Sequence, residues 1–140
     1  MRPLFLRLAS VALLCAGIVA CAAPPLTTAD TQRLNALLPA DVLLVGEQHD
    51  APEHQQLQRQ VVRWLAERGS LAALAMEMAE RGHSTANLPR HATEAQVRQA
   101  LAWDDAGWPW KTYGPVVMEA VRAGAPVLGA NLPRAQMRQA

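Results

Sequence analysis

The sequence predicts an α/β fold built on a parallel sheet with crossover helices. Three short apolar runs, residues 42–45, 71–78 and 126–130, have the length and composition of strands buried in a sheet. The segments between them contain apolar residues at helical spacing. Because strands that alternate with helices are typical of parallel sheets, and because crossovers are right-handed, we expect the carboxyl ends of all three strands at one edge.

The first crossover helix is expected to begin near Pro52 and to end at Gly69. Asp50 is a candidate cap for it, and proline is well tolerated in a first helical turn. Apolar side chains recur at four-residue spacing from Leu57 to Leu65, which gives the helix one apolar face. Glycine is a common stop signal at the carboxyl end of a helix.

Two further helices are expected between the second and third strands. Residues 83–91 are polar and typical of a loop, and residues 94–102 favour a short helix. Residues 103–115 are rich in aromatic residues and are interrupted by glycine and proline. Residues 115–123 then favour a helix that stops at Gly124.

The first 21 residues are typical of a bacterial lipoprotein signal peptide. Arg2 and Arg7 supply a positive amino-terminal region, and residues 8–19 form an apolar stretch that is too short to span a bilayer as a stable helix. The stretch ends in a lipobox-like sequence at Cys21, whose acylation would tether the protein to a membrane surface. An uncleaved anchor, or a plain secretory signal with a chance cysteine, are the alternatives. Residues 22–35 are expected to be a linker.

Charge and cysteine content exclude some classes of protein. The net charge of the whole chain is +1, and removal of Arg2 and Arg7 leaves 11 basic against 12 acidic residues. This balance does not indicate a nucleic-acid partner, which needs a clustered basic face. Cys15 would be lost with the signal peptide and Cys21 would carry lipid, so no disulfide is expected within the mature chain.

Polar residues follow each predicted strand and define a candidate crevice. Glu47 and His49 come directly after the first strand, Glu77 lies at the end of the second, and Asn131 ends the third. If all three ends meet at one edge, these side chains share a crevice where ligands bind in open α/β sheets. Glu47, His49 and Glu77 would then suit a divalent metal ion, or a proton transfer between a carboxylate and an imidazole.

A structural role for the same residues remains open. Glu47 and Asp50 are suited to cap the following helix, and His49 to hydrogen-bond a loop carbonyl. An acid among apolar neighbours needs a partner, so Glu77 is expected either in the crevice or paired with Arg81 or Arg134.

Aromatic residues gather in a short segment that supplies further candidates. Trp103, Trp108, Trp110 and Tyr113 lie within residues 103–113 and form either a small core under the loop or a wall for a flat apolar ligand. Tyr113 is the single tyrosine, and phenolate is a known axial ligand of haem iron. Lys111 would suit a carboxylate on such a ligand, and His54 either points toward the site or faces solvent.

Four blocks of sequence together carry a family resemblance. They are Val45–Asp50 followed by His54, Met76–Met78, Trp108–Pro109 with Tyr113–Pro115, and Gly129–Arg134. These blocks resemble those of the ChaN-like haem-binding lipoproteins of the haem-binding uptake, Tiki superfamily, and the lipobox at Cys21 agrees. The resemblance implies an α/β domain, lipid anchoring at the bacterial outer membrane, and haem binding connected with iron acquisition.

The resemblance also implies roles for individual residues. Tyr113 takes the place of the haem-iron ligand, with help from a histidine and from a second subunit, which makes a homodimer a candidate assembly. The remaining expected haem-binding residues are His49, His54, Trp110, Lys111 and Asn131. The wider superfamily includes proposed metal-dependent hydrolases, and their motif falls on Gly46 and His49, with Glu47 and Glu77 as companion acids.

The predicted domain, residues 36–140, corresponds to the amino-terminal portion of the family domain. The chain stops just as Pro133 would open another helix, and family domains are about twice as long. Half of a parallel sheet leaves an exposed strand edge, which favours association. An inactive truncated fragment is therefore a third interpretation, beside a haem-binding lipoprotein and a metal-dependent hydrolase.

Overall fold

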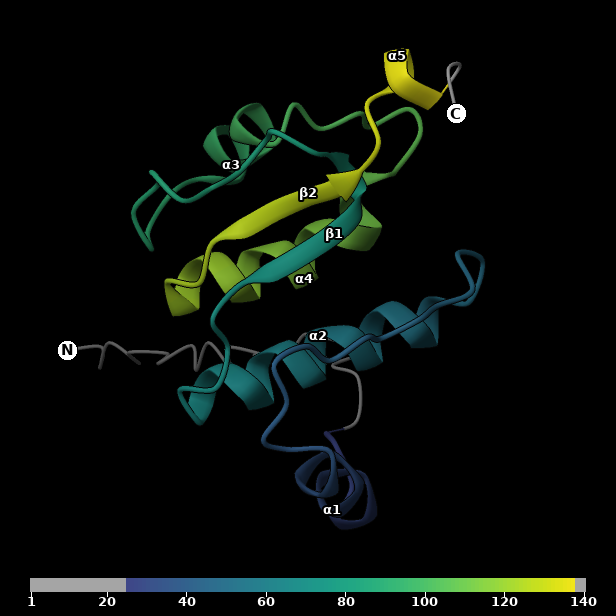
Figure 1. The fold of residues 1–140 in the computed structure, drawn as a ribbon, viewed down its shortest axis with the longest axis vertical. Helices are drawn as coiled ribbons and strands as arrows, with labels where there is room; N and C mark the ends of the chain where they lie inside the picture. The colour runs from purple at the N-terminus through teal and green to yellow at the C-terminus, as the bar shows by residue number, and fades with distance from the viewer. Residues whose placement is uncertain (1–24, 138–140) are drawn as a thin grey trace, which may run out of the picture.

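The computed structural model describes residues 25–137 and confirms a small α/β fold. As Figure 1 shows, helices precede the first strand, connect the two strands and follow the second strand. The elements are α1 (Thr28–Ala36), α2 (Pro52–Glu67), β1 (Leu74–Glu80), α3 (Glu94–Ala100), α4 (Trp110–Ala123), β2 (Val127–Asn131) and α5 (Arg134–Met137).

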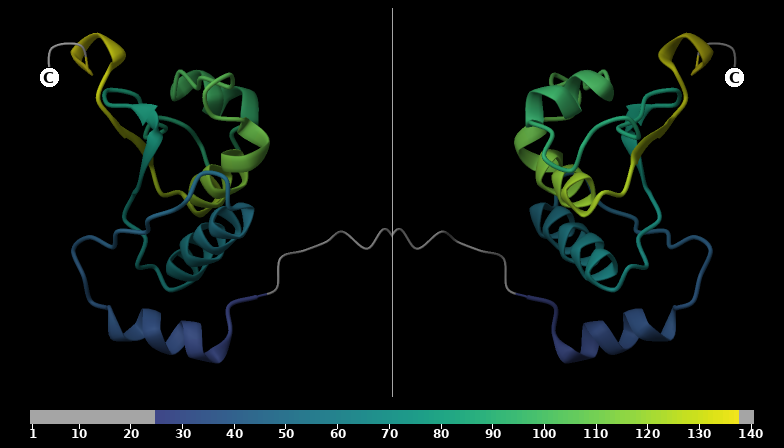
Figure 2. Two further views of the ribbon diagram at one scale, coloured as in Figure 1. Left: turned by 90° about the vertical axis from the view of Figure 1, so that its right-hand side faces the viewer. Right: turned by 90° about the vertical axis from the view of Figure 1, so that its left-hand side faces the viewer.

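The sheet that the structure describes has two parallel strands, with α3 and α4 in the connection between them. Leu74 pairs with Val127 and Met76 with Gly129. In Figure 2 the sheet is seen on edge, with α3 and α4 on one side of it. Met76, Met78 and Val127 are buried on that side, whereas Ala75 and Glu77 between them are exposed. The alternation shows that one face of the sheet is packed and the other is open.

The main core lies between the sheet and α4. Its fully buried members include Val97, Leu101, Val116, Val117 and Val127, and Val62 of α2 joins the same cluster. A second, smaller cluster consists of Val61, Trp64 and Leu65 on α2, with leucines from the amino-terminal segment against it. Helix α2 therefore carries apolar residues for both clusters.

Helix α4 begins earlier than the sequence predicted. It starts at Trp110 rather than at residue 115, so Pro115 lies inside the helix. Proline removes one helical hydrogen bond, but Tyr113, Val116 and Val117 are all buried on this helix, and burial of that face outweighs the loss. Gly114 is required because a Cβ there would lie 2.5 Å from the ring of Trp110.

The predicted first strand is wrong. Residues 42–47 have no strand assignment and form no backbone hydrogen bond with any other described residue. Leu44 is 89% exposed and Val42 is 73% exposed, so the run is not in the core. An apolar run becomes a strand only when another strand pairs with it, and no described strand does so.

The start of α2 also differs from the expectation. Ala51, not Asp50, occupies the N-cap position, and no side chain caps the helix. His54 closes the preceding loop instead, because its Nδ1 accepts a hydrogen bond of 2.9 Å from the backbone N–H of Gln48.

Helix α1 lies within the predicted linker. Thr27 caps it by accepting a hydrogen bond from the backbone N–H of Asp30, whose carboxylate in turn accepts one from the N–H of Thr27. The signal peptide and Cys21 lie outside the described residues, so these predictions and the domain boundary at residue 36 stay predictions. Among residues 25–137, no helix has the length and apolar character that crossing a bilayer requires.

Candidate functional site

Glu47 and His49 form a hydrogen-bonded pair at the end of the extended segment. Nδ1 of His49 lies 2.7 Å from Oε1 of Glu47. A carboxylate only accepts, so Nδ1 carries the proton and donates it, and in the neutral imidazole Nε2 is then the lone-pair nitrogen. The Glu47 side chain is 5% exposed and the His49 side chain 47% exposed. The acid therefore lies deep and orients an imidazole that solvent or a ligand can reach.

The other carboxylate oxygen of Glu47, Oε2, is enclosed by the protein. It is buried and has no hydrogen bond of good geometry among the described residues, although the Glu47 carboxylate also interacts with the phenol of Tyr113. An ionised oxygen in such a position is costly unless a donor reaches it. One carboxylate oxygen of Glu47 therefore holds His49, and the other is closed to solvent.

Aromatic rings connect this pair to the core. The imidazole of His49 contacts Trp108 edge to face with ring centroids 4.9 Å apart, and Trp108 contacts Tyr113 in the same way at 5.7 Å. Trp103 fills the space on the other side of Tyr113, with ring centroids 6.3 Å apart. Because edge-to-face contacts fix ring orientation as well as burial, α4 and the loop before it hold His49 from one side.

Tyr113 is buried and its phenol is held in the neutral form. It is 2% exposed. Burial raises the pKa of Tyr113 to about 12, and the charge of Glu47, a hydrogen bond with Glu47 and the charge of Glu77 act in the same direction. An anionic phenolate at this position would lie among carboxylates in the core.

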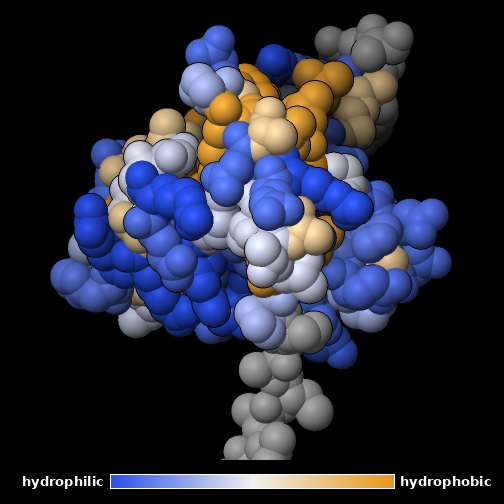
Figure 3. All heavy atoms as spheres, turned by 90° about the horizontal axis from the view of Figure 1, so that it is seen from below, coloured by the Kyte–Doolittle hydropathy of each residue, from blue (hydrophilic) through white to orange (hydrophobic). Residues whose placement is uncertain are grey.

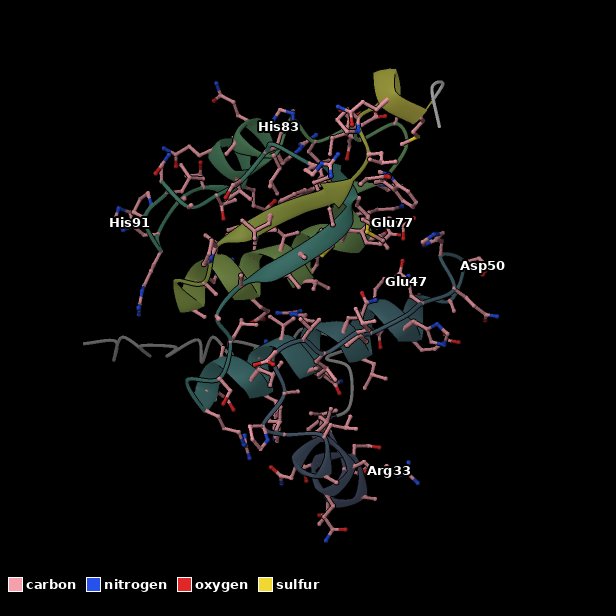
Figure 4. The ribbon with its side chains drawn as sticks, in the orientation of Figure 1. Arg33, Glu47, Asp50, Glu77, His83 and His91 are labelled. Carbon is pink, nitrogen blue, oxygen red and sulfur yellow. The ribbon has the colours of Figure 1, made fainter. Side chains whose placement is uncertain are left out.

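Two hollows meet near this pair, as Figure 4 lets the reader follow from Glu47 and Glu77. The first is a groove of about 510 Å³ between residues 41–47 and β1, and its floor is formed by α2. The second has a volume of about 290 Å³ and lies at the end of the sheet. Glu77 and Met78 line both hollows, His49 lines the groove, and Trp108 and Asn131 line the second hollow. We call the junction between His49, Glu77 and Trp108 the crevice.

Glu77 does not need the partner that its apolar neighbours suggested. Its side chain belongs to the open face of β1 and is exposed. Strand residues alternate between faces, so Glu77 lies opposite to the buried methionines on either side of it. The three side chains that were predicted to share one crevice do not line one hollow. Glu77 shares the groove with Glu47 and the second hollow with Asn131, but Glu47 and Asn131 share neither.

Three other candidates lie away from the crevice. Trp110 is buried, and its indole N–H donates to the carboxylate of Glu94 at 2.8 Å. Lys111 is exposed and lines neither hollow. His54 holds the loop at Gln48. Their haem-binding roles stay predictions, and each has a structural position of its own.

The described residues contain no group of three or more His, Cys, Asp or Glu side chains arranged to hold a metal ion. Glu47 and His49 are hydrogen-bonded to each other through Oε1 of Glu47 and Nδ1 of His49. Of the aromatic residues, Trp108 was not singled out from the sequence as a site residue. Its position before Pro109, within one of the family blocks, was the available signal.

Comparison with known families matches the chain over residues 33–140. The matching family is described as haem-binding uptake, Tiki superfamily, ChaN. The chain belongs to this family. Searches of curated proteins and of solved structures gave no match. The family assignment agrees with the resemblance drawn from the four sequence blocks.

Proposed function

We propose that this ChaN-family protein binds haem in the crevice, with Nε2 of His49 as an iron ligand. The observation that carries the proposal is the 2.7 Å hydrogen bond between Nδ1 of His49 and Glu47. Histidines that bind metals commonly donate their other N–H to a carboxylate, which fixes the ring and raises its basicity. Neutral imidazole is a common haem-iron ligand.

The surroundings of His49 suit the porphyrin ring better than its carboxylates. Trp108 stands against the imidazole, and Met78, Ala79 and Met137 supply apolar lining to the second hollow. The acids that line the two hollows, Glu47, Glu77, Glu80 and Asp104, would repel carboxylates. A bound porphyrin would therefore be held by His49 and Trp108, with its carboxylates toward solvent.

Tyr113 is the second candidate ligand, because the family resemblance gives it that role. Two features bear on this role: Tyr113 is 2% exposed, and burial raises its pKa to about 12. A phenolate ligand would need to lose its proton beside Glu47 and to leave its packed position on α4. His49 needs neither change, so we rank it first.

Titration of the full chain in mild detergent with haemin tests the assignment. We expect a Soret band whose haem affinity falls at least tenfold in His49→Ala and stays within about twofold in Tyr113→Phe. His91→Ala is the matched control, because that imidazole is exposed and lines neither hollow. Loss of the band in Tyr113→Phe but not in His49→Ala would transfer the ligand role to Tyr113.

We also propose that acylated Cys21 anchors the protein in the bacterial cell envelope, at the outer membrane, where it takes part in iron or haem acquisition. The lipobox-like sequence before Cys21 supports this location. Metabolic labelling with a fatty acid should mark the wild-type chain and not Cys21→Ser. Labelling of both chains would reject Cys21 as the acylated residue. Homodimerisation stays a prediction that size-exclusion chromatography with light scattering tests.

A metal-dependent hydrolase that uses Glu47, His49 and Glu77 remains the alternative from sequence. No arrangement of three candidate ligands among the described residues favours it. Metal analysis of freshly prepared protein, compared with His49→Ala, tests it. A stoichiometric divalent ion that disappears in the variant would support the hydrolase.

A further inference from the structure

Of the two edges of the sheet, only the outer edge of β2 is hydrogen-bonded to another described segment. Residues 83–85 cover the outer edge of β2, since the N–H of Thr85 donates to the carbonyl of Val127 and the N–H of Gly129 donates to that of His83, both at 3.0 Å. No described residue covers the edge of β1 in this way. A bare edge is a template for another strand.

The backbone groups on that bare edge can be assigned from the pairing. The N–H of Leu74 points to β2, because it donates to the carbonyl of Pro126 at 2.9 Å. Successive residues of a strand point their backbone groups to opposite sides. The N–H and C=O groups of Ala75 therefore face the groove, whereas the register of β1 shifts between Met76 and Glu80.

The opposite wall of the groove is also unpaired backbone. Residues 42–46 run alongside the groove and form no backbone hydrogen bond with another described residue. Leu44, at 89% exposed, and Val42, at 73%, extend from this wall. Figure 3 shows that apolar surface gathers on one side of the molecule. Two extended segments thus flank one groove without pairing to each other.

The groove has the apolar floor of a strand site. Its volume is about 510 Å³, and Val61, Val62 and Leu65 of α2 form this floor together with Val116 of α4. Five strand residues span about 16 Å, so a strand of five residues would match the five extended residues of the wall at 42–46. A β-strand in the groove could hydrogen-bond through its main chain to β1 on one side and to residues 42–46 on the other. Its apolar side chains would pack on the floor formed by α2 and α4.

The charge of the groove defines one end of that occupant. Asp41, Glu47 and Glu77 line it, and none of the described lining residues is lysine or arginine. Both walls run in the same direction (Figure 1), so a parallel occupant would bring its carboxyl end to Glu47 and Glu77. A cationic side chain there would pair with the exposed carboxylate of Glu77, and the charge of Glu47 would add to the attraction.

We propose that this groove is an acceptor site for one parallel β-strand of another polypeptide, apolar in sequence and with a lysine or arginine at its carboxyl end. Main-chain hydrogen bonds to both walls provide affinity, and the apolar floor and the acidic end provide specificity, as in other cases of strand addition. The strand completes a four-stranded sheet whose carboxyl edge borders the crevice. The proposal is independent of haem binding.

The test uses the full chain in mild detergent and a fluorescein-labelled peptide of five alternating valines and threonines followed by lysine. Fluorescence anisotropy should show saturable binding. The same peptide with N-methyl groups on alternate amides should bind at least tenfold more weakly, because it keeps the side chains and loses the hydrogen bonds. Glutamate in place of the lysine should weaken binding at least fivefold.

A variant of the acceptor edge complements the peptide series. Ala75→Pro removes the N–H that faces the groove, and proline is tolerated where the missing N–H faces away from the partner strand. We expect at least a tenfold loss of peptide binding. Ala72→Pro is the matched control, because Ala72 is exposed, precedes β1 and lines no part of the groove.

Three outcomes would overturn the proposal. These are absence of binding, equal binding of the N-methylated peptide, and protection of the amides of residues 42–47 from hydrogen exchange before any peptide is added. The last would mean that the two walls pair directly. If Ala75→Pro fails to fold, as circular dichroism would show, the comparison of the two peptides on the unchanged chain decides the matter.

Discussion

The region before residue 72 and the region after residue 73 are built in contrasting ways. Residues 74–133 enclose nearly all of the main core between the sheet and α4. Residues 25–71 contribute Val62 to the main core and have a small cluster of three buried residues of their own on α2, and they contain the exposed run at residues 42–45. The second region is a packed unit, whereas the first is attached to it through one face of α2.

The contrast explains where the candidate chemistry lies. His49 and Glu47 come from the loosely packed region, while Trp108, Tyr113 and Glu77 come from the packed one. The crevice and the groove are therefore on the boundary between a rigid wall and a weakly held one. Ligand sites commonly occupy such boundaries, because the low-stability side can adjust.

The largest expected effect compares the same substitution, valine to alanine, in the packed and in the loosely packed region. Val117→Ala should lower the free energy of unfolding by about 3 kcal/mol, because Val117 is 0% exposed and the change leaves a cavity. Val42→Ala removes the same atoms from a side chain that is 73% exposed. This change should alter the free energy of unfolding by less than about 0.5 kcal/mol. Urea denaturation followed by circular dichroism measures both. Equal effects would mean that residues 42–45 are packed in solution.

The second expected effect concerns the phenol at the boundary. The pKa of Tyr113 is raised by burial, then by the charge of Glu47, to about 12, and the unfolded chain should titrate near 10. Below pH 10 both states keep the proton and the contribution is zero. Between pH 10 and 12 only the unfolded state loses it, so stability should fall by about 1.4 kcal/mol per pH unit.

Absorbance near 295 nm reports this titration directly, because the chain has a single tyrosine. Tyr113→Phe supplies the baseline, and its stability should lack the additional fall above pH 10. A native titration midpoint near 10 would show that the phenol is open to solvent. The packed region that carries Tyr113 would then not differ at the crevice from the loosely packed region that carries His49.

The third expected effect concerns the covered edge of β2. Thr85 is 4% exposed, and its Oγ1 accepts a hydrogen bond of 2.8 Å from the backbone N–H of Val127. Thr85→Val keeps the shape but leaves that buried N–H without a partner, so we expect a loss of about 2 kcal/mol. Ser84→Ala, at a more exposed neighbouring position, should cost less than about 0.5 kcal/mol. Equal costs in thermal melts would show that the cover at residues 83–85 opens readily.

Sequence patterns predicted the long amphipathic helices of both regions well because the signals of such helices are local. Apolar spacing located α2, and Gly69 and Gly124, which have φ of +65° and +82°, marked the ends of α2 and α4. The family and the α/β class also followed from sequence. The start of α4 was missed because Pro115 is a breaker in isolation and is tolerated only where the helix face is buried.

The loosely packed region was predicted less well because its signals need a partner. Val42 to Val45 has the composition of a buried strand, but composition does not supply the strand that must pair with it. The capping box of Thr27 and Asp30 indicated α1, yet the segment was assigned to a linker from its prolines and threonines. In the site, the pairing of Glu47 with His49 followed from their spacing, whereas the contact of His49 with Trp108 depends on tertiary packing.

The smallest expected effect concerns the attachment of the two regions. Glu119 on α4 accepts hydrogen bonds from Arg59 and Arg63 on α2. Burial alone would raise the pKa of the Glu119 carboxyl, but the bonds from Arg63 and Arg59 lower it further than burial raises it. The Glu119 side chain is 13% exposed, and the side chains of Arg59 and Arg63 are 41% and 50% exposed. Water therefore screens these two ion pairs only in part.

Glu119→Gln should lower stability by about 1 kcal/mol at neutral pH, since it keeps the shape and removes the charge. The wild-type advantage is present above the carboxyl pKa of the unfolded chain and should disappear as pH falls through the lower native pKa. Hydrogen exchange should accelerate in α2 more than in β2, because the link holds the weaker region onto the stronger one. Equal acceleration in both would mean that the chain opens as one cooperative unit, and the boundary that holds the crevice would have no separate flexibility.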